Sequence, residues 1–196
     1  MKTTLLALIC ILTSKVLPAQ DFDSTDVRNV KWQPNGLTSD NFRLVDKKPT
    51  NPDSAMLEAV TGGWIAYRYW SIGPDHFRVW IQTYLDYNQS WMLRKSIKKK
   101  ALLNHEQRHL DLVEIEARNF GKAIAGFAFT QNYQSEMPFI FKNVMDDLKR
   151  VQSIYDENTE HGSNSDAQKL WNAKIDNFLN TLPPVDGIFI DVEIHG

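Results

Sequence analysis

The sequence is poor in cysteine, in long apolar runs and in excess positive charge. Cys10 is its only cysteine, which excludes a disulfide framework within the chain and a metal site built from cysteines. No run after Ala19 is long and apolar enough for a membrane helix, which needs about 20 residues. The formal net charge of the chain is −2, so the chain lacks the excess of basic residues typical of nucleic-acid-binding proteins. We therefore expect a soluble globular chain, with neither nucleic acid nor a membrane anchor as a partner.

The start of the chain has the pattern of a cleavable secretory signal. A lysine near the first residue, a short apolar run over residues 5–12 and the small residue Ala19 are typical of such segments. We predict that residues 1–19 are a signal peptide and that the remaining chain is secreted or periplasmic. Cys10 would be removed with the signal. Residues 20–196 would then form a single domain, which is long enough to bury a core without disulfide bonds.

The N-terminal half of this domain has the patterns of strands and turns. Thr61–Trp70 and His76–Tyr87 are rich in aromatic and β-branched residues, and turn residues at 73–75 separate them. We predict a β-hairpin from these two segments. Shorter strands are expected around Val30–Trp32 and Phe42–Leu44, so the whole region would form a small, mostly antiparallel sheet.

The C-terminal half has helical periodicity, interrupted by polar, turn-rich segments. The predicted helices run from an N-cap at Ser90 to about Phe127 with a break near Gly121, from a first turn containing Pro138 to about Tyr155, and from a capping box of Ser165 and Gln168 to Leu182. Asp186–Ile194 could add a terminal strand. The predicted fold class is therefore α+β, with the sheet packed on the first helix and further helices following it.

The first helix carries the motif H-E-x-x-H in His105, Glu106 and His109. Residues four apart on a helix project side by side, so the two imidazoles can bind one ion. Glu106 would lie beside the metal, where it can activate a zinc-bound water for attack on a peptide bond. At 100° per residue both histidines fall on the inward apolar face, where unpaired polar groups are costly. The motif therefore predicts a catalytic Zn²⁺ site.

A catalytic zinc usually has three protein ligands, so a third one is needed. The compact extended motif that supplies a third histidine on the same segment is absent, because Leu112 and Ile115 occupy its positions. His161, in the turn "TEHGSN", is our candidate, since a loop histidine beside a glycine can approach a metal freely. His76 and His195 are weaker candidates.

Several neighbouring residues are assigned secondary roles. Metal-bound histidines usually donate their other N–H to a carboxylate or carbonyl, and Asp156 and Glu116 are the carboxylates predicted to accept. Tyr155 is a candidate catalytic residue that could hydrogen-bond a developing oxyanion, with a packed aromatic as the alternative. Glu114 and Arg118 are expected to form a structural ion pair across one helical turn.

Two segments carry a family resemblance: "LLNHEQRHLDLVEIEAR" and "YDENTEHGSNSDAQKLWNAKI". They resemble the domain of unknown function 922 family, bacterial proteins predicted to be secreted zinc-dependent proteases. Its members carry an H-E-Q-x-H-x-D-x-x-E-x-x-A-R-like helix, then Y-D-x-x-T-x-H-G and Q-x-x-W. The residues that match the second segment are Tyr155, Asp156, Thr159, His161, Gly162, Gln168 and Trp171. The resemblance continues more loosely upstream, and it implies protease activity and supports His161 as third ligand.

The sequence therefore predicts a zincin-like metallopeptidase domain over residues 20–196, with a peptide or protein as substrate and no predicted oligomeric state. One alternative is a non-catalytic zinc-binding or scaffold protein that uses the same ligands for stability. In that case a fourth protein ligand, for instance His76, would close the metal site. A second alternative is a zinc hydrolase that cleaves a non-peptide bond.

Overall fold

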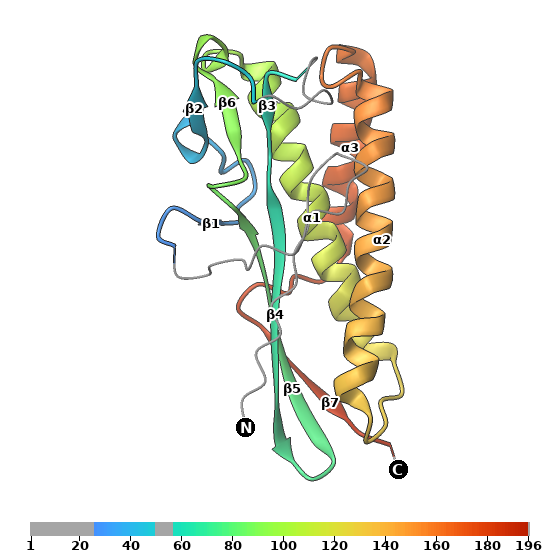
Figure 1. Ribbon diagram of the computed structural model, residues 1–196. Coiled ribbons are helices and arrows are strands. Elements are labelled where there is room, and N and C mark those ends of the chain that lie inside the picture. The colour runs from blue at the N-terminus through green and yellow to red at the C-terminus, as the bar shows by residue number, and fades with distance from the viewer. Residues whose placement is uncertain (1–25, 50–56, 196) are drawn as a thin grey trace.

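The computed structural model describes residues 26–49 and 57–195 (Figure 1). The predicted signal peptide, with Cys10, lies outside the described residues. Within them the chain forms the predicted α+β fold, in which a mostly antiparallel set of strands precedes three long helices and a last strand returns to the first sheet.

The first sheet is built around the predicted β-hairpin, which is confirmed. β4 (Gly63–Gly73) and β5 (His76–Leu85) pair antiparallel along almost their whole length. The other edge of β5 pairs with β1 (Val30–Lys31) at one end and with β7 (Phe189–Glu193) at the other, both antiparallel. The predicted terminal strand is therefore present, and it closes the sheet beside the hairpin (Figure 1).

A second, smaller sheet lies at one end of the molecule. It contains β2 (Arg43–Val45), β6 (Trp91–Leu93) and β3 (Ala59–Val60), with β6 in the centre. β2 runs parallel to β6, whereas β3 runs antiparallel and forms an edge of this sheet. Figure 1 places it beside the start of the first long helix.

The first long helix, α1 (Lys100–Gly126), begins later than the sequence predicted. Residues near Ser90 do not start it, because the apolar Trp91–Leu93 segment pairs as β6 and the 3₁₀ helix η3 (Arg94–Ser96) follows. The predicted N-cap is wrong for the same reason, since the Ser90 hydroxyl instead donates to the backbone oxygen of Asp86 at 2.6 Å.

The predicted break near Gly121 is also absent. A Cβ at Gly121 would lie 2.7 Å from Cγ1 of Val185, so the glycine allows the helix to approach the segment leading into β7. α1 therefore continues through this position without interruption.

The other two helices are longer or differently capped than predicted. α2 (Tyr133–Thr159) starts before Pro138, which lies inside the helix, and continues one turn beyond Tyr155. α3 (Ser165–Thr181) is capped by Asn164, whose side chain accepts from the backbone N–H of Ala167 at 3.1 Å. The predicted capping box at Ser165 is therefore wrong, because its partner Gln168 is buried against α1 and α2.

The helix α1 lies at the centre of the fold, between the hairpin sheet on one side and α2 and α3 on the other (Figure 1). Most of its side chains are buried as a result, including charged ones such as Glu106 and Arg118. Among the described helices, none has both the length and the hydrophobicity needed to cross a membrane. Charged side chains that are buried on a central helix need specific hydrogen-bond or ion-pair partners. The partners of the polar residues on α1 define the candidate site.

We expect Gly63→Ala to destabilise the protein. An added Cβ would lie 2.6 Å from Cγ2 of Val113 and 3.3 Å from Cδ1 of Leu110, at the point where β4 crosses α1. Overpacking of this kind costs about 1–3 kcal/mol, measurable as a lower urea midpoint. The control is Gly73→Ala in the hairpin, where nothing lies within 4 Å of the added atom. Equal stability of the two variants would contradict this account of the packing.

Candidate metal centre

His105 and His109 lie side by side on the first half of α1, as the motif predicted. Their Nε2 atoms are 3.1 Å apart, and the two residues are only 2 % and 5 % exposed. The helical spacing of four residues brings the rings together, and the packing of α2 against α1 keeps them from solvent.

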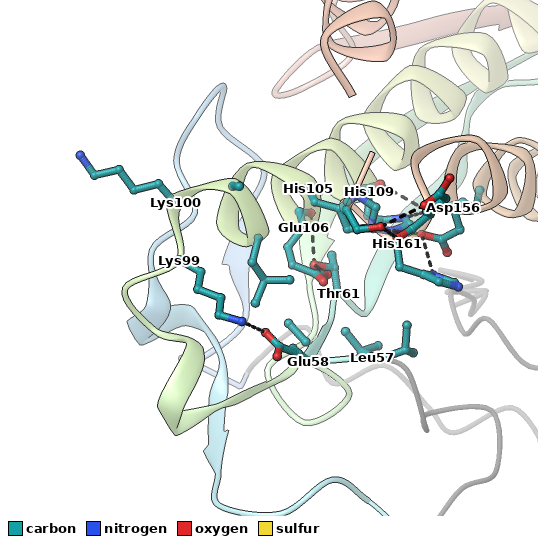
Figure 2. Close-up of a pocket in the computed structure, with 18 residues that line it drawn as sticks. Leu57, Glu58, Thr61, Lys99, Lys100, His105, Glu106, His109, Asp156 and His161 are labelled. Atoms are coloured by element: carbon teal, nitrogen blue, oxygen red, sulfur yellow. Dashed lines mark hydrogen bonds and ion pairs between the residues drawn. The ribbon is translucent and has the colours of Figure 1, made fainter. Parts of the chain in front are cut away.

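Asp156, in the last turn of α2, is the third member of this cluster. Its Oδ1 lies 3.1 Å from Nε2 of His105 and 3.0 Å from Nε2 of His109 (Figure 2). The ligand atoms of the three residues all lie within 4.8 Å of one another. The sequence had assigned Asp156 an outer, supporting role, whereas the structure brings its carboxylate into contact with both imidazoles.

His161, the predicted third ligand, lies beside Asp156. Its Nδ1 is 3.4 Å from Oδ1 of Asp156, and its side chain is 45 % exposed. It is not one of the three residues that form the tight cluster. Its role as a ligand therefore remains a prediction.

The turn that carries His161 has an unusual backbone. Glu160, His161 and Gly162 all have positive φ, at 50°, 52° and 83°, a conformation that residues other than glycine rarely adopt. The turn brings Gly162 against the ring of His105, where a Cβ would lie 2.9 Å from Cγ. Glycine is thus required both by the backbone angle and by the space beside the histidine.

Glu106 lies at the same end of α1 and is held by a hydroxyl. Thr61, which directly follows β3, donates to Oε2 of Glu106 at 2.7 Å, as Figure 2 shows. Both residues are buried in the fold and line the same pocket as the histidines. The contact fixes the carboxylate beside the cluster.

Two glutamines contact the histidines at their Nδ1 atoms, whereas Asp156 contacts the Nε2 atoms. Nδ1 of His105 lies 3.0 Å from Oε1 of Gln168, and Nδ1 of His109 contacts Oε1 of Gln152. Sequence reasoning missed this role for both glutamines. Gln152 could have been found if α2 had been predicted to continue to Thr159, because it then lies one turn before Asp156 on the same helix face.

Tyr155 supports the site from within the core. Its ring stacks on His105 with centroids 4.8 Å apart, and its hydroxyl lies 3.2 Å from the backbone oxygen of His105 and 3.1 Å from Oε1 of Gln168. The side chain is fully buried and is not among the residues that line the pocket. This arrangement corresponds to the packed aromatic that the sequence offered as the alternative to an oxyanion donor.

The other residues considered from the sequence lie elsewhere. Glu116 accepts from Asn119 at 3.2 Å and lines a separate groove between α1 and α2. His76 starts β5 opposite Glu193, and the backbone N–H of His195 donates to Phe129. The predicted structural ion pair is confirmed, with Nε of Arg118 2.8 Å from Oε1 of Glu114.

The cluster is strongly polarised. Burial lowers the pKa of His109, but the adjacent Asp156 carboxylate outweighs this effect and raises it to about 9. Burial would raise the pKa of Asp156, yet the charge of His109 and hydrogen bonds from both histidines hold it well below its usual range. Without a metal the site is therefore a buried imidazolium–carboxylate pair.

A pocket of about 590 Å³ opens onto this cluster. β3, the first turn of α1 and the turn after α2 line it, and Thr61, Glu106 and Asp156 lie within its wall (Figure 2). At its rim Nζ of Lys99 lies 2.6 Å from Oε2 of Glu58, which connects the start of α1 with the segment before β3.

Comparison with known proteins agrees with the motif resemblance. Residues 87–162 match the model of a family described as bacterial protein of unknown function (DUF922). The matched range contains His105, Glu106, His109, Asp156 and His161, and the description names no activity. The chain matches no curated protein and no solved structure.

The unfolding free energy of the metal-free protein should fall as the pH rises toward 9. The pKa of His109 is about 9 in the fold, above the unfolded value of about 6.5. Its contribution is therefore complete below about pH 6.5 and is lost as the pH rises through the folded pKa. The shift corresponds to stabilisation on the order of 3 kcal/mol.

Urea unfolding in the presence of a chelator at several pH values would measure this slope, and His109→Gln should remove it. Asp156 has a lowered pKa, so its contribution is instead lost as the pH falls below about 4. An alkaline slope that is unchanged in His109→Gln would contradict the assignment.

Proposed function

We propose that this protein is an exported zinc-dependent peptidase, in which Glu106 acts as general base. The observation that carries the proposal is the triangle formed by Nε2 of His105, Nε2 of His109 and Oδ1 of Asp156, with edges of 3.0–3.1 Å. It lies in the wall of a pocket that also contains a fixed glutamate.

The spacing of these three atoms suits a zinc ion. Zinc binds imidazole nitrogen and carboxylate oxygen at about 2.0–2.2 Å in tetrahedral geometry, which separates neighbouring ligand atoms by about 3.3 Å. In addition, Oδ2 of Asp156 is buried and has no hydrogen-bond partner among the described residues. A cation would satisfy a carboxylate that is otherwise only partly paired.

The surroundings of Glu106 support a role as general base, because its carboxylate is buried in the lining of the same pocket as the two histidines. A zinc ion held by the triad would supply an acidified water and a polarised substrate carbonyl. Oε2 of Glu106 is held by Thr61, which leaves the other carboxylate oxygen to take a proton from the attacking water. As the C–O bond forms and the C–N bond breaks, Glu106 passes that proton to the leaving amine, giving a carboxylic acid and an amine.

An extended substrate could bind along β3. Glu58 accepts from the backbone N–H of Leu93 at 2.8 Å, and Ala59 is the next residue along the strand, opposite Met92. In an antiparallel ladder alternate residues face opposite sides, so the N–H and C=O of Ala59 point away from β6. Ala59 is buried but lines the pocket, so a peptide that pairs with this edge by strand addition would have to reach it through the pocket.

The alternative function, a non-catalytic zinc protein, requires a fourth protein ligand that excludes water. His161 is the candidate for that ligand, because its Nδ1 is 3.4 Å from Oδ1 of Asp156. Glu106 lines the pocket and accepts a hydrogen bond from Thr61. This favours the enzyme over the non-catalytic zinc protein, since a closed structural site needs no base beside the metal.

Metal analysis of purified variants should separate the ligands. We expect Asp156→Ala to lose most of its zinc, because it removes one corner of the triangle. His161→Ala should keep a stoichiometric ion if the triad is sufficient. The measurement is zinc content after dialysis, together with a dissociation constant from chelator competition. Loss of zinc only in His161→Ala would contradict Asp156 as the third ligand.

Glu106→Gln should retain zinc and lose hydrolysis. The amide keeps the size of the side chain and can still contact Thr61, but it cannot accept the proton of the attacking water. General-base catalysis contributes about 10²–10⁴-fold, so cleavage of a peptide library should fall by at least that order. The control is Glu116→Gln, in the separate groove. A Glu106→Gln protein that cleaves as fast as wild type would overturn the mechanism.

A further inference from the structure

A histidine ring can present either of its nitrogens to a metal, and the fold must decide which one. Nε2 can bind an ion only when it carries no proton, so in the neutral ring the proton must lie on Nδ1. The two glutamines that contact the Nδ1 atoms can impose this choice, provided that their oxygens, and not their NH₂ groups, face the rings.

The orientation of Gln168 follows from its neighbours. Nε of Arg108 lies 3.2 Å from a terminal atom of Asn172, and because a guanidinium only donates, that atom must be the Asn172 oxygen. The same oxygen lies 2.9 Å from the end of Gln168, which must therefore be the NH₂ group. The oxygen of Gln168 then faces Nδ1 of His105 at 3.0 Å.

The orientation of Gln152 is fixed in a simpler way. One end of its amide lies 3.3 Å from the backbone oxygen of His109. A carbonyl only accepts, so this end is the NH₂ group and the opposite oxygen contacts Nδ1 of the same histidine. A group of fixed polarity thus determines the outcome at each histidine: a guanidinium for His105 and a main-chain carbonyl for His109.

We infer that Gln152 and Gln168 are positioning residues that hold both histidines with the proton on Nδ1 and Nε2 free for the metal. Asn172 and Arg108 act one and two contacts further out, by orienting Gln168. The inference rests on the proposed metal site but not on peptide hydrolysis. Arg108 is itself held by Asp111 at 2.9 Å and Asp176 at 2.6 Å, so the chain of contacts begins at an ion-pair network near α3.

Zinc affinity of the full-length protein is the first test, measured by competition with a chromophoric chelator. Gln168→Met and Gln152→Met remove the acceptor and keep a side chain of similar length, and each should weaken zinc binding by about 10- to 100-fold. The matched control is Gln134→Met on the exposed side of α2, which should bind zinc like wild type.

Asn172 provides a second pair of variants that leaves the site itself intact. Asn172→Leu removes the oxygen that orients Gln168 and should weaken zinc binding, whereas Asn172→Asp keeps an acceptor and should retain wild-type affinity. Circular dichroism should show that both variants are folded. Equal affinities for the two variants, or unchanged affinity in both glutamine variants, would overturn the inference.

The proton positions can be read directly by NMR of protein with ¹⁵N-labelled histidine. In the zinc-loaded protein we expect Nδ1–H signals from His105 and His109 that exchange slowly with solvent. Gln168→Met should remove that protection at His105 only. A ring with its proton on Nε2 would contradict the inference.

The same Nδ1–H signals exist in the metal-free protein, where the glutamine oxygens accept them equally. A wild-type protein that binds no zinc would reject the metal site, and the glutamine contact is then tested by Gln168→Met, which should still remove the protection of the Nδ1–H of His105 in the metal-free protein. A protein that binds zinc but lacks these Nδ1 protons would support the metal site and reject the positioning role of the glutamines.

Discussion

The fold depends on burying a polar patch on its central helix. α1 packs against the hairpin sheet on one side and α2 and α3 on the other, so its histidines and Glu106 are buried, and they line the pocket. Burial of such groups is unfavourable unless each one is paired. The surrounding elements supply these partners: α2 provides Asp156 and Gln152, α3 provides Gln168, and Thr61 beside β3 contacts Glu106.

This requirement explains why the site is assembled from distant parts of the chain. The motif on α1 supplies only two of the converging atoms. The third comes from α2, about 50 residues downstream, and the outer contacts come from α3. The packing of the three helices is therefore inseparable from the geometry of the site, and these polar contacts join the helices in addition to the apolar core.

Local patterns were sufficient for the hairpin, the terminal strand and the motif helix, because each has a strong periodic signal. They failed where distant pairing decided the outcome. The short apolar run Trp91–Leu93 fits a helix as well as a strand. It is a strand because it pairs with β2 and β3, which come from distant parts of the chain. At the site, ending α2 near Tyr155 placed Asp156 outside the helix. With α2 continuing to Thr159, Gln152 and Asp156 share one face, which accounts for the missed Gln152 and for the contact of Asp156 with both imidazoles.

The short segment around β3 has two neighbours at once. Its outer edge borders the pocket, and the residue that follows it, Thr61, holds the Glu106 carboxylate through a hydroxyl. Any shift of this strand along its own axis would carry that hydroxyl with it. Under the proposed function, one short strand would therefore set the position of the substrate and that of the Glu106 carboxylate together.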